Sequence, residues 1–418
     1  MLTYLFLLFL CPLLATSLSQ TSASLVFSSP TQLPWGCPTH KCRYGGSTAA
    51  DSFVSFGGAL QNTVIGVVHN SNTTSVVAHS ADSGSTWTAS SSGGLGPGIS
   101  YLISNNTRTT IGNAVLYPNI TKTAAYGSTR AIYNISAAGT LERTIVHQDS
   151  MWKFPLDPKH NLSPVCLFSS YSGKVIQIYT PWQGKTWLKT VVIKRNCTKP
   201  PAGSWGTLGY ADIWIFASVD QTTWQYQSEV ANHAQTKALG YEEGANENDI
   251  AVLADGTLLV VFRADGGDGY PNHSRKPFLK VTSMDSGLTW SSPVPMADNI
   301  GSARPMLLMV ESGVLLLSGG RPYLNLWASM DGLGKQWDSY NLAGQHNLAA
   351  VRTSTWKFCE SFANGTSTWQ GSTCYTSLVQ VEKGNVLVCY DNLGTASPVA
   401  PVECQTNPVL TFCMRIEV

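Results

Sequence analysis

An eight-residue pattern that occurs twice constrains the fold of this 418-residue chain more than any other feature. Residues 80–87 and 283–290 both read Ser-x-Asp-x-Gly-x-Thr-Trp, and weaker copies lie at 180–187, 218–224 and 329–337. In a tight turn, Asp can accept backbone N–H groups, Gly supplies a positive φ, and Trp buries its ring beneath the hairpin. We therefore expect a repeated β architecture held by these turns, and we assign the turn residues no catalytic role.

The remainder of the chain also favours β structure. Short apolar runs rich in Val, Ile and Leu, such as 63–68, 173–179 and 313–318, alternate with Gly, Asn, Asp, Ser and Pro. No long apolar pattern with a period of 3.6 residues is present. The sequence predicts an all-β domain.

Charge excludes several classes of partner. The 26 Lys and Arg residues balance 25 Asp and Glu residues, and only 12% of the chain is charged. Such a balance provides no basic surface for nucleic acid and no polybasic membrane patch. The hydrophobic fraction of 43% is sufficient for a large packed core.

An apolar run at residues 2–15 is short for a membrane span, which needs about 20 residues, and fits a secretory signal peptide. We expect a signal at 1–19, a single mature domain at 20–418, secretion to the extracellular space, and no membrane span once the signal is removed. Eight Asn-x-Ser/Thr sequons agree with this route.

The nine cysteines that follow Cys11 suggest disulfides between sequence neighbours. The expected pairs are Cys37/Cys42, Cys166/Cys197, Cys359/Cys374 and Cys404/Cys413, which leaves Cys389 without a partner. Cys37, His40 and Cys42 could ligate a metal, but no second ligand pair with zinc-site spacing follows. We expect no metal and no cofactor.

The turn pattern resembles the Asp-box of the sialidase (neuraminidase) superfamily. This resemblance implies a six-bladed β-propeller of four-stranded antiparallel blades. The mature chain is long enough for six blades of about 40 to 65 residues each. Asp-boxes also occur in propellers that are not enzymes, so the chemistry has to be argued from other residues.

Three segments of the C-terminal half can be read as hairpins that return two polar residues to the same end. A turn at 255–256 would pair Glu247 with Arg263. A turn at 312–313 would pair Arg304 with Arg321, and one at 383–385 would pair Tyr375 with Asp391. A radial arrangement would gather these ends around one funnel.

The resemblance to sialidases implies a role for each of these residues. Tyr375 corresponds to the nucleophile and Glu247 to the carboxylate that activates it, although Glu242 and Glu243 are nearby rivals for that role. Asp391 corresponds to the acidic residue that supports the first arginine of a clamp for the substrate carboxylate, where Glu is usual.

The clamp itself would contain three arginines. Arg43 is chosen as the first because it alone lies between the signal and the first turn motif; Arg263 is the second. Arg321 is the third, with Arg304 as its rival. Each of Arg304 and Arg321 precedes Pro and could equally serve a structural role.

The general-acid Asp of the family is missing from the strand before the first turn motif. His69 occupies roughly its place, and Asp51 could reach the same rim. Loss of a general acid lowers the rate for a poor leaving group by about 10² to 10⁴.

These residues suit a sugar that carries a carboxylate on its anomeric carbon, because a neutral tyrosine nucleophile avoids the repulsion that a carboxylate would meet. We expect a retaining glycoside hydrolase that releases terminal sialic acid or a related acidic sugar from a glycan. The alternatives are a related propeller glycosidase or polysaccharide lyase that uses His69 and Tyr375 on another acidic saccharide, and a catalytically silent carbohydrate-binding propeller.

Overall fold

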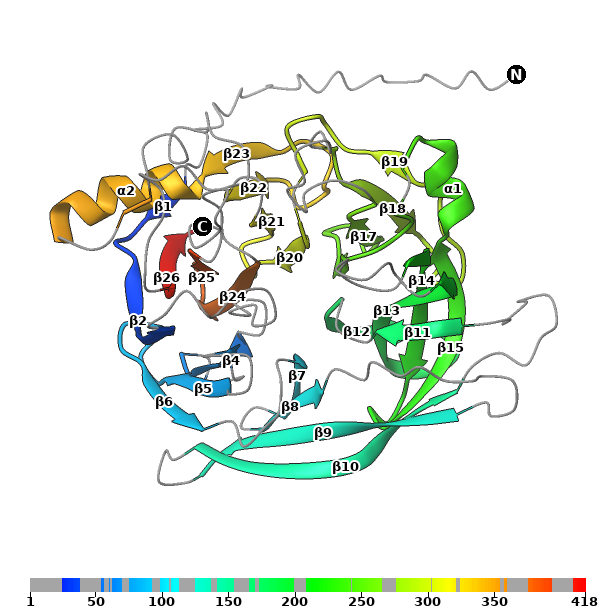
Figure 1. The fold of residues 1–418 in the computed structure, drawn as a ribbon, viewed down its shortest axis with the longest axis horizontal. Coiled ribbons are helices and arrows are strands. Elements are labelled where there is room, and N and C mark those ends of the chain that lie inside the picture. Colours follow the sequence, from blue (N-terminus) through cyan, green and yellow to red (C-terminus); the bar gives the residue numbers. More distant parts are fainter. Residues whose placement is uncertain are drawn as a thin grey trace, which may run out of the picture.

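The strands of the chain form sheets arranged around the middle of the molecule (Figure 1). A computed structural model describes residues 25–37, 54–55, 60, 62–69, 75–91, 98–104, 107–112, 125–136, 141–153, 165–169, 173–198, 208–241, 243–264, 276–301, 303–320, 324–353, 357–358, 375–392 and 409–418. Within these residues the strands form five sheets.

Three of the sheets contain four antiparallel strands each. One consists of β3 (Val54–Ser55), β4 (Val64–His69), β5 (Ser75–Ser80) and β6 (Thr88–Ser91). The next consists of β16 (Asn248–Val252), β17 (Leu258–Phe262), β18 (Leu279–Ser283) and β19 (Val294–Pro295). The third consists of β20 (Met306–Met309), β21 (Leu315–Gly319), β22 (Asn325–Ser329) and β23 (Asp338–Asn341).

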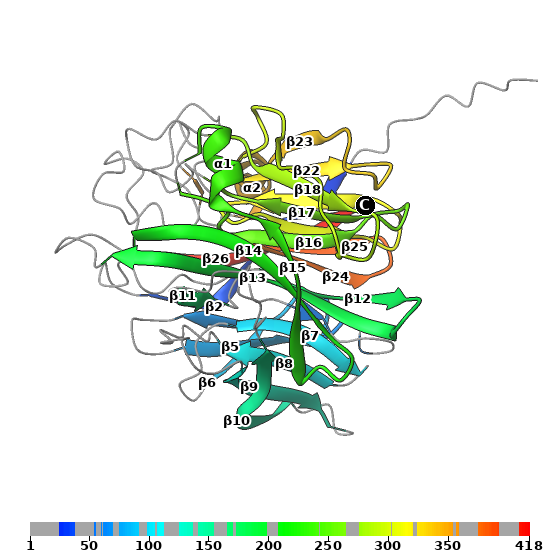
Figure 2. The same ribbon diagram turned by 90° about the vertical axis from the view of Figure 1, so that its right-hand side faces the viewer.

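A nine-stranded sheet contains two antiparallel groups that are joined by parallel pairing of β10 with β15. Its first group is β7 (Gly98–Ser104), β8 (Thr107–Gly112), β9 (Ala125–Ile135) and β10 (Leu141–Lys153). Its second group is β11 (Val165–Ser169), β12 (Val175–Thr180), β13 (Gly184–Thr198), β14 (Leu208–Ser218) and β15 (Thr223–Ala231). Figure 2 shows the long strands of this sheet from the side.

The fifth sheet combines strands from both ends of the sequence. It consists of β24 (Thr376–Glu382), β25 (Asn385–Asp391), β26 (Val409–Glu417), β1 (Val26–Phe27) and β2 (Thr31–Cys37). Both β1 and β2 pair antiparallel with β26.

The strands predicted at 63–68, 173–179 and 313–318 are confirmed as β4, β12 and β21. The fold is mostly β, but it also contains α1 (His233–Ala238) and α2 (Leu342–Thr353), which the sequence analysis did not predict. Asn232 and Gln235 form a capping box at the start of α1. The sequence of α2 mixes polar residues with small apolar ones, so it carries little helical periodicity, and it packs against a sheet through Leu342 and Ala343.

The turn motifs adopt the predicted local structure. In four of them a Ser hydroxyl donates to the Asp two residues later, at 2.8–3.0 Å. The Asp82 and Asp285 carboxylates also accept the backbone N–H groups of Thr86 and Thr289 at 2.8 and 2.9 Å. Gly84 has a φ of +81°, as a turn of this kind requires.

These turns also connect neighbouring sheets. Arg415 on β26 donates to Ser83 O at 3.0 Å, Ser228 on β15 donates to Gly287 O at 2.7 Å, and Lys280 on β18 donates to Gly334 O at 3.1 Å. Each donor lies in a different sheet from the turn that it contacts. The motif therefore fixes how adjacent sheets meet as well as how its own hairpin folds.

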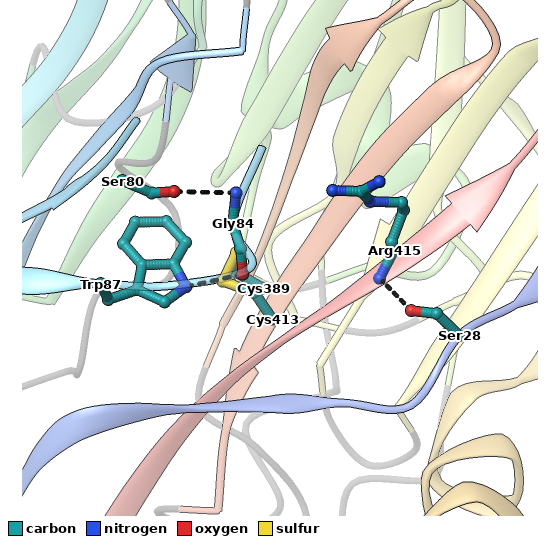
Figure 3. Close-up of a disulfide and its surroundings, with 7 residues drawn as sticks. All are labelled: Ser28, Ser80, Gly84, Trp87, Cys389, Cys413 and Arg415. Carbon is teal, nitrogen blue, oxygen red and sulfur yellow. Dashed lines mark hydrogen bonds between the residues drawn. A yellow bond between two sulfur atoms is a disulfide. The ribbon is translucent and has the colours of Figure 1, made fainter. Parts of the chain in front are cut away.

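A disulfide joins Cys389 on β25 to Cys413 on β26 (Figure 3). The expectation that Cys389 is unpaired and that Cys413 bonds Cys404 was wrong. The register places Cys389 directly opposite Cys413, with Cα atoms 4.1 Å apart, so the two sulfur atoms can bond without moving the backbone. The pair packs in the same apolar cluster as the buried Trp87 ring.

The other predicted cysteine pairs involve residues or side chains outside the described part of the structure. Cys42, Cys359, Cys374 and Cys404 lie outside the described residues, and the side chains of Cys37, Cys166 and Cys197 do so as well. In the described part of the chain, no helix is both long and apolar enough to cross a membrane. No group of three or more His, Cys, Asp or Glu side chains that could hold a metal ion occurs among those residues.

Candidate functional site

The hairpin of β16 and β17 places Glu247 beside Arg263. Asn248 pairs with Phe262 in the ladder, and the backbone N–H of Arg263 donates to Glu247 O at 2.8 Å, so the pairing continues one residue beyond the named strands. Gly256 in the connecting turn has a φ of +85°. The predicted return of Glu247 and Arg263 to one end of a hairpin is confirmed.

Two further residues reach this point from the starts of neighbouring strands. Arg304 precedes β20 by two residues, and Tyr375 directly precedes β24. The hydroxyl groups of Ser318 on β21 and Thr376 on β24 form a hydrogen bond of 2.8 Å, which holds these two sheets together near the site.

Glu247 forms the centre of the cluster. Its Oε1 accepts a hydrogen bond from the Tyr375 hydroxyl. Its Oε2 accepts from the backbone N–H of Arg304 at 3.0 Å and from Arg263 Nη1 at 3.3 Å. The Glu247 side chain is 14% exposed and that of Arg263 is 8% exposed, so these contacts are largely shielded from water.

The guanidinium of Arg304 lies over the Tyr375 ring, with Cζ 5.2 Å from the ring centroid. This arrangement is a cation–π contact. Arg304 is buried and has a φ of +38°, a conformation that L-residues rarely adopt. Strained residues of this kind persist where the surrounding structure fixes them, and they concentrate at functional sites.

Arg263 has a second carboxylate partner, which the sequence analysis named only as a rival for Glu247. Its Nη2 lies 3.0 Å from both Oε1 and Oε2 of Glu243, whose side chain is 25% exposed. Glu243 is positioned by Gly244, which bridges to Ala211 on β14 with a φ of +85°.

Lys194 on β13 lies within electrostatic range of the same group. The pKa of Lys194 is lowered overall, chiefly by burial. The carboxylates of Glu243 and Glu247 oppose this shift, and Arg263 adds to it. The site therefore combines a tyrosine hydroxyl with two carboxylates, two guanidinium groups and an ammonium group.

Asp249, two residues after Glu247, joins β16 to Lys174 beside β12 and to Leu307 on β20. It is 1% exposed, and its carboxylate accepts the backbone N–H groups of Lys174 at 2.9 Å and Leu307 at 2.7 Å. Its Oδ2 also lies 3.2 Å from Lys174 Nζ. Nearby, the buried Lys189 donates to Gly173 O at 2.8 Å, and burial lowers the pKa of Lys189 to about 7 against the opposing effect of Asp249.

Of the remaining predicted residues, the structure describes Asp391 and the backbone of His69. Asp391 is fully buried and is the last residue of β25. Thr376 pairs with Tyr390, so Asp391 lies next to the start of β24, where Tyr375 was predicted to pair with it. His69 is the last residue of β4 and pairs with Ser75, but its side chain lies outside the described residues. Arg43, Arg321, Asp51 and Glu242 lie outside them entirely.

A tyrosine hydroxyl bonded to a carboxylate, beside two arginines, could act as a nucleophile with that carboxylate as its base. The structure brings together Tyr375, Glu247, Arg263 and Arg304. Arg304, which the sequence analysis ranked below Arg321, is the arginine that contacts both Tyr375 and Glu247.

Neither a protein-family model nor a curated protein sequence matches this chain. Among solved structures, a Dyadobacter fermentans protein of unknown function is similar over 94% of this chain and 99% of that one, with a TM-score of 0.56 and 14% identity. A Penicillium chrysogenum α-L-arabinanase is similar over 93% and 98% of the two chains, with a TM-score of 0.51 and 11% identity.

The Trypanosoma rangeli sialidase matches 94% of this chain, which spans 59% of that protein, with a TM-score of 0.49 and 13% identity. At such identities the similarity to the bacterial protein and to the arabinanase concerns the fold alone. Any activity of this chain therefore has to be argued from its own residues.

Proposed function

We propose that the chain is a retaining glycoside hydrolase that uses Tyr375 as its nucleophile and releases a terminal sialic acid or a related acidic sugar. One observation carries this proposal: the Tyr375 hydroxyl donates to Glu247, and the Glu247 carboxylate is itself held by Arg263 and Arg304. A base in direct contact with a hydroxyl nucleophile is the geometry that covalent catalysis requires.

In the first step, Glu247 Oε1 takes the proton of Tyr375 while Tyr375 Oη bonds to the anomeric carbon of the sugar. The bond from that carbon to the leaving oxygen breaks, and the leaving oxygen takes a proton from a general acid. The Arg304 guanidinium over the ring stabilises the negative charge that develops on the tyrosine oxygen. We propose His69 as the acid.

In the second step, water attacks the anomeric carbon and gives one proton to the group that acted as the acid. The bond to Tyr375 Oη breaks, and Glu247 returns the proton to the tyrosine. Two displacements at the same carbon give net retention of configuration.

The nucleophile supports the assignment of an acidic substrate. Tyrosine is neutral until Glu247 removes its proton, so it can approach an anomeric carbon that carries a carboxylate, where a carboxylate nucleophile would be repelled. We propose that Arg263, Arg304, Arg43 and Arg321 hold that carboxylate, with Asp391 supporting Arg43.

We also propose that the sheets are blades of a closed six-bladed propeller. The described strands divide into six groups, because the nine-stranded sheet contains two antiparallel groups, and the N-terminal β1 joins the C-terminal β26. A secreted location, with residues 1–19 removed as a signal, remains part of this proposal.

A second candidate is a glycosidase that acts on a neutral sugar such as an arabinan. The engagement of Arg263 by Glu243 and Glu247 favours it. The arabinanase of similar fold suggests only which neutral sugar to test. In this case Arg263 would orient the two glutamates and would not bind substrate.

Hydrolysis of an aryl sialoside, a sialyl-oligosaccharide and an arabino-oligosaccharide tests both candidates. We expect Glu247→Gln to slow sialoside cleavage by about 10² to 10⁴, since it removes the base, and Tyr375→Phe to abolish it. As a control, Tyr340→Phe removes a tyrosine hydroxyl from β23, the outermost strand of another sheet, and should leave the rate unchanged.

A slow fluorinated substrate should add the mass of the sugar to the peptide that contains Tyr375. Cleavage of sialosides at the normal rate by Tyr375→Phe would refute the mechanism. Cleavage of the arabino-oligosaccharide alone would establish the second candidate, and binding without turnover of any substrate would leave a carbohydrate-binding protein.

A further inference from the structure

The guanidinium of Arg263 is already occupied by carboxylates of the protein itself. Nη2 lies 3.0 Å from both oxygens of Glu243, and Nη1 lies 3.3 Å from Oε2 of Glu247. A carboxylate is the group that a planar guanidinium binds best through paired N–H donors. Glu243 therefore stands in for a substrate carboxylate at this arginine.

The two glutamates differ in how firmly they are held. Glu247 also contacts the Tyr375 hydroxyl and the backbone of Arg304, and its side chain is 14% exposed. Glu243 is 25% exposed, so its carboxylate is nearer to the solvent from which a sugar would arrive. Glu243 is thus the partner that an incoming carboxylate would compete with.

The backbone beside Glu243 cannot move away easily. A Cβ at Gly244 would lie 2.5 Å from Ala211 O, and Gly244 bridges to Ala211. Any response to a ligand must therefore come from the Glu243 side chain, with the backbone at Gly244 remaining fixed.

Part of the charge at this place opposes an acidic ligand. Two carboxylates contact Arg263 and would repel a third, although the positive charges of Arg304 and Lys194 would attract it. Loss of the Glu243 charge would remove part of that repulsion and would also weaken the contact with Nη2, because a neutral amide oxygen is a weaker acceptor than a carboxylate.

We propose that Glu243 is a specificity-determining residue, which competes with the carboxylate of the sugar for Arg263 and so limits the preference of the site for acidic over neutral sugars. This inference rests on the proposed function only in placing the sugar beside Arg263. It assigns Glu243 a role in selection and none in bond breaking.

Sialic acid and its methyl ester are suitable probes, because they differ in the charge of the carboxyl group and otherwise only in one methyl group. In calorimetry at pH 7 we expect wild-type protein to bind the acid more tightly than the ester, since the proposed arginines bind a carboxylate. Glu243→Gln should bind the acid about tenfold more tightly, with less than a twofold change for the ester. That factor corresponds to a difference of about 1.4 kcal/mol.

Glu311→Gln, which removes the same charge from an exposed turn between β20 and β21, should alter neither affinity. Weaker binding of the acid by folded Glu243→Gln than by wild type would overturn the inference. Equal affinities for the acid in wild type and in folded Glu243→Gln would also overturn it, as would failure of both proteins to bind either form. Whether Tyr375→Phe loses hydrolysis decides the proposed function separately.

Discussion

Replacement of Asp249 by Asn should destabilise the protein far more than the small chemical change suggests. The Asp249 carboxylate accepts two backbone N–H groups, from Lys174 and Leu307, and pairs with the Lys174 ammonium group. An amide has one acceptor oxygen and one NH₂ group, so one of these buried donors would face another donor.

The cost follows from these contacts. An unsatisfied buried donor costs about 1 to 3 kcal/mol, and removal of one partner of a buried ion pair costs about 3 to 5 kcal/mol. Lys174 is 26% exposed, so water can compensate part of its loss. We therefore expect Asp249→Asn to lower the free energy of unfolding by about 3 kcal/mol, within the combined range of these effects.

Urea unfolding followed by tryptophan fluorescence measures this difference. Asp255→Asn is the matched control, because Asp255 is exposed on a turn and accepts only from neighbouring residues such as Thr257, at 3.0 Å. It should change the free energy of unfolding by less than about 1 kcal/mol. Equal, small effects of the two substitutions would refute the reasoning.

Two further predictions concern Gly244 and Asp220. Gly244→Ala should reduce sialoside hydrolysis while the protein remains folded. Its φ is +85° and the added Cβ would meet Ala211 O at 2.5 Å, so the backbone would shift and displace Glu243 and Glu247. Unchanged kinetics would contradict this. Desolvation raises the pKa of Asp220, but hydrogen bonds from Thr223 N, Thr222 N and the Ser218 hydroxyl outweigh it and lower the pKa to about 2. A depressed pKa stabilises the fold above the unfolded value of 3.8 and loses that effect as pH falls through 2. Solvent screening reduces the effect at this exposed group. The free energies of unfolding of wild type and Asp220→Asn, measured in urea, should therefore differ by about 1 kcal/mol at pH 5, and the difference should disappear near pH 2. A difference that stays constant with pH would contradict this prediction.

The features that the sequence predicted well are local. The turn at 283–290 forms from Ser283, Asp285 and Thr289, which lie within seven residues and bond to one another. The pairing of Glu247 with Arg263 follows equally from a single Asp-Gly turn midway between them. In both cases the chain that determines the contact is short and continuous.

The features that it missed depend on chain segments that are distant in sequence. Glu243 reaches Arg263 because Gly244 bridges to Ala211 on another sheet, and no pattern near Glu243 indicates that bridge. Cys389 bonds Cys413 because β25 and β26 are neighbours, whereas the prediction relied on short sequence separation. Asp249 reads as an ordinary strand residue until β12 and β20 are placed beside it.

The pairing of β1 with β26 has a consequence for synthesis. Val26 and Phe27 find their partners Glu417 and Ile416 only after almost the whole chain has been made. At a translation rate of roughly 5 to 20 residues per second, the chain between these strands takes about 20 to 80 s to emerge. Throughout that interval the edge of β1 has no native partner, and the fifth sheet cannot be completed. The first of the described strands to leave the ribosome is thus among the last of them to reach its native place, and a nascent chain must avoid false strand pairing for that time.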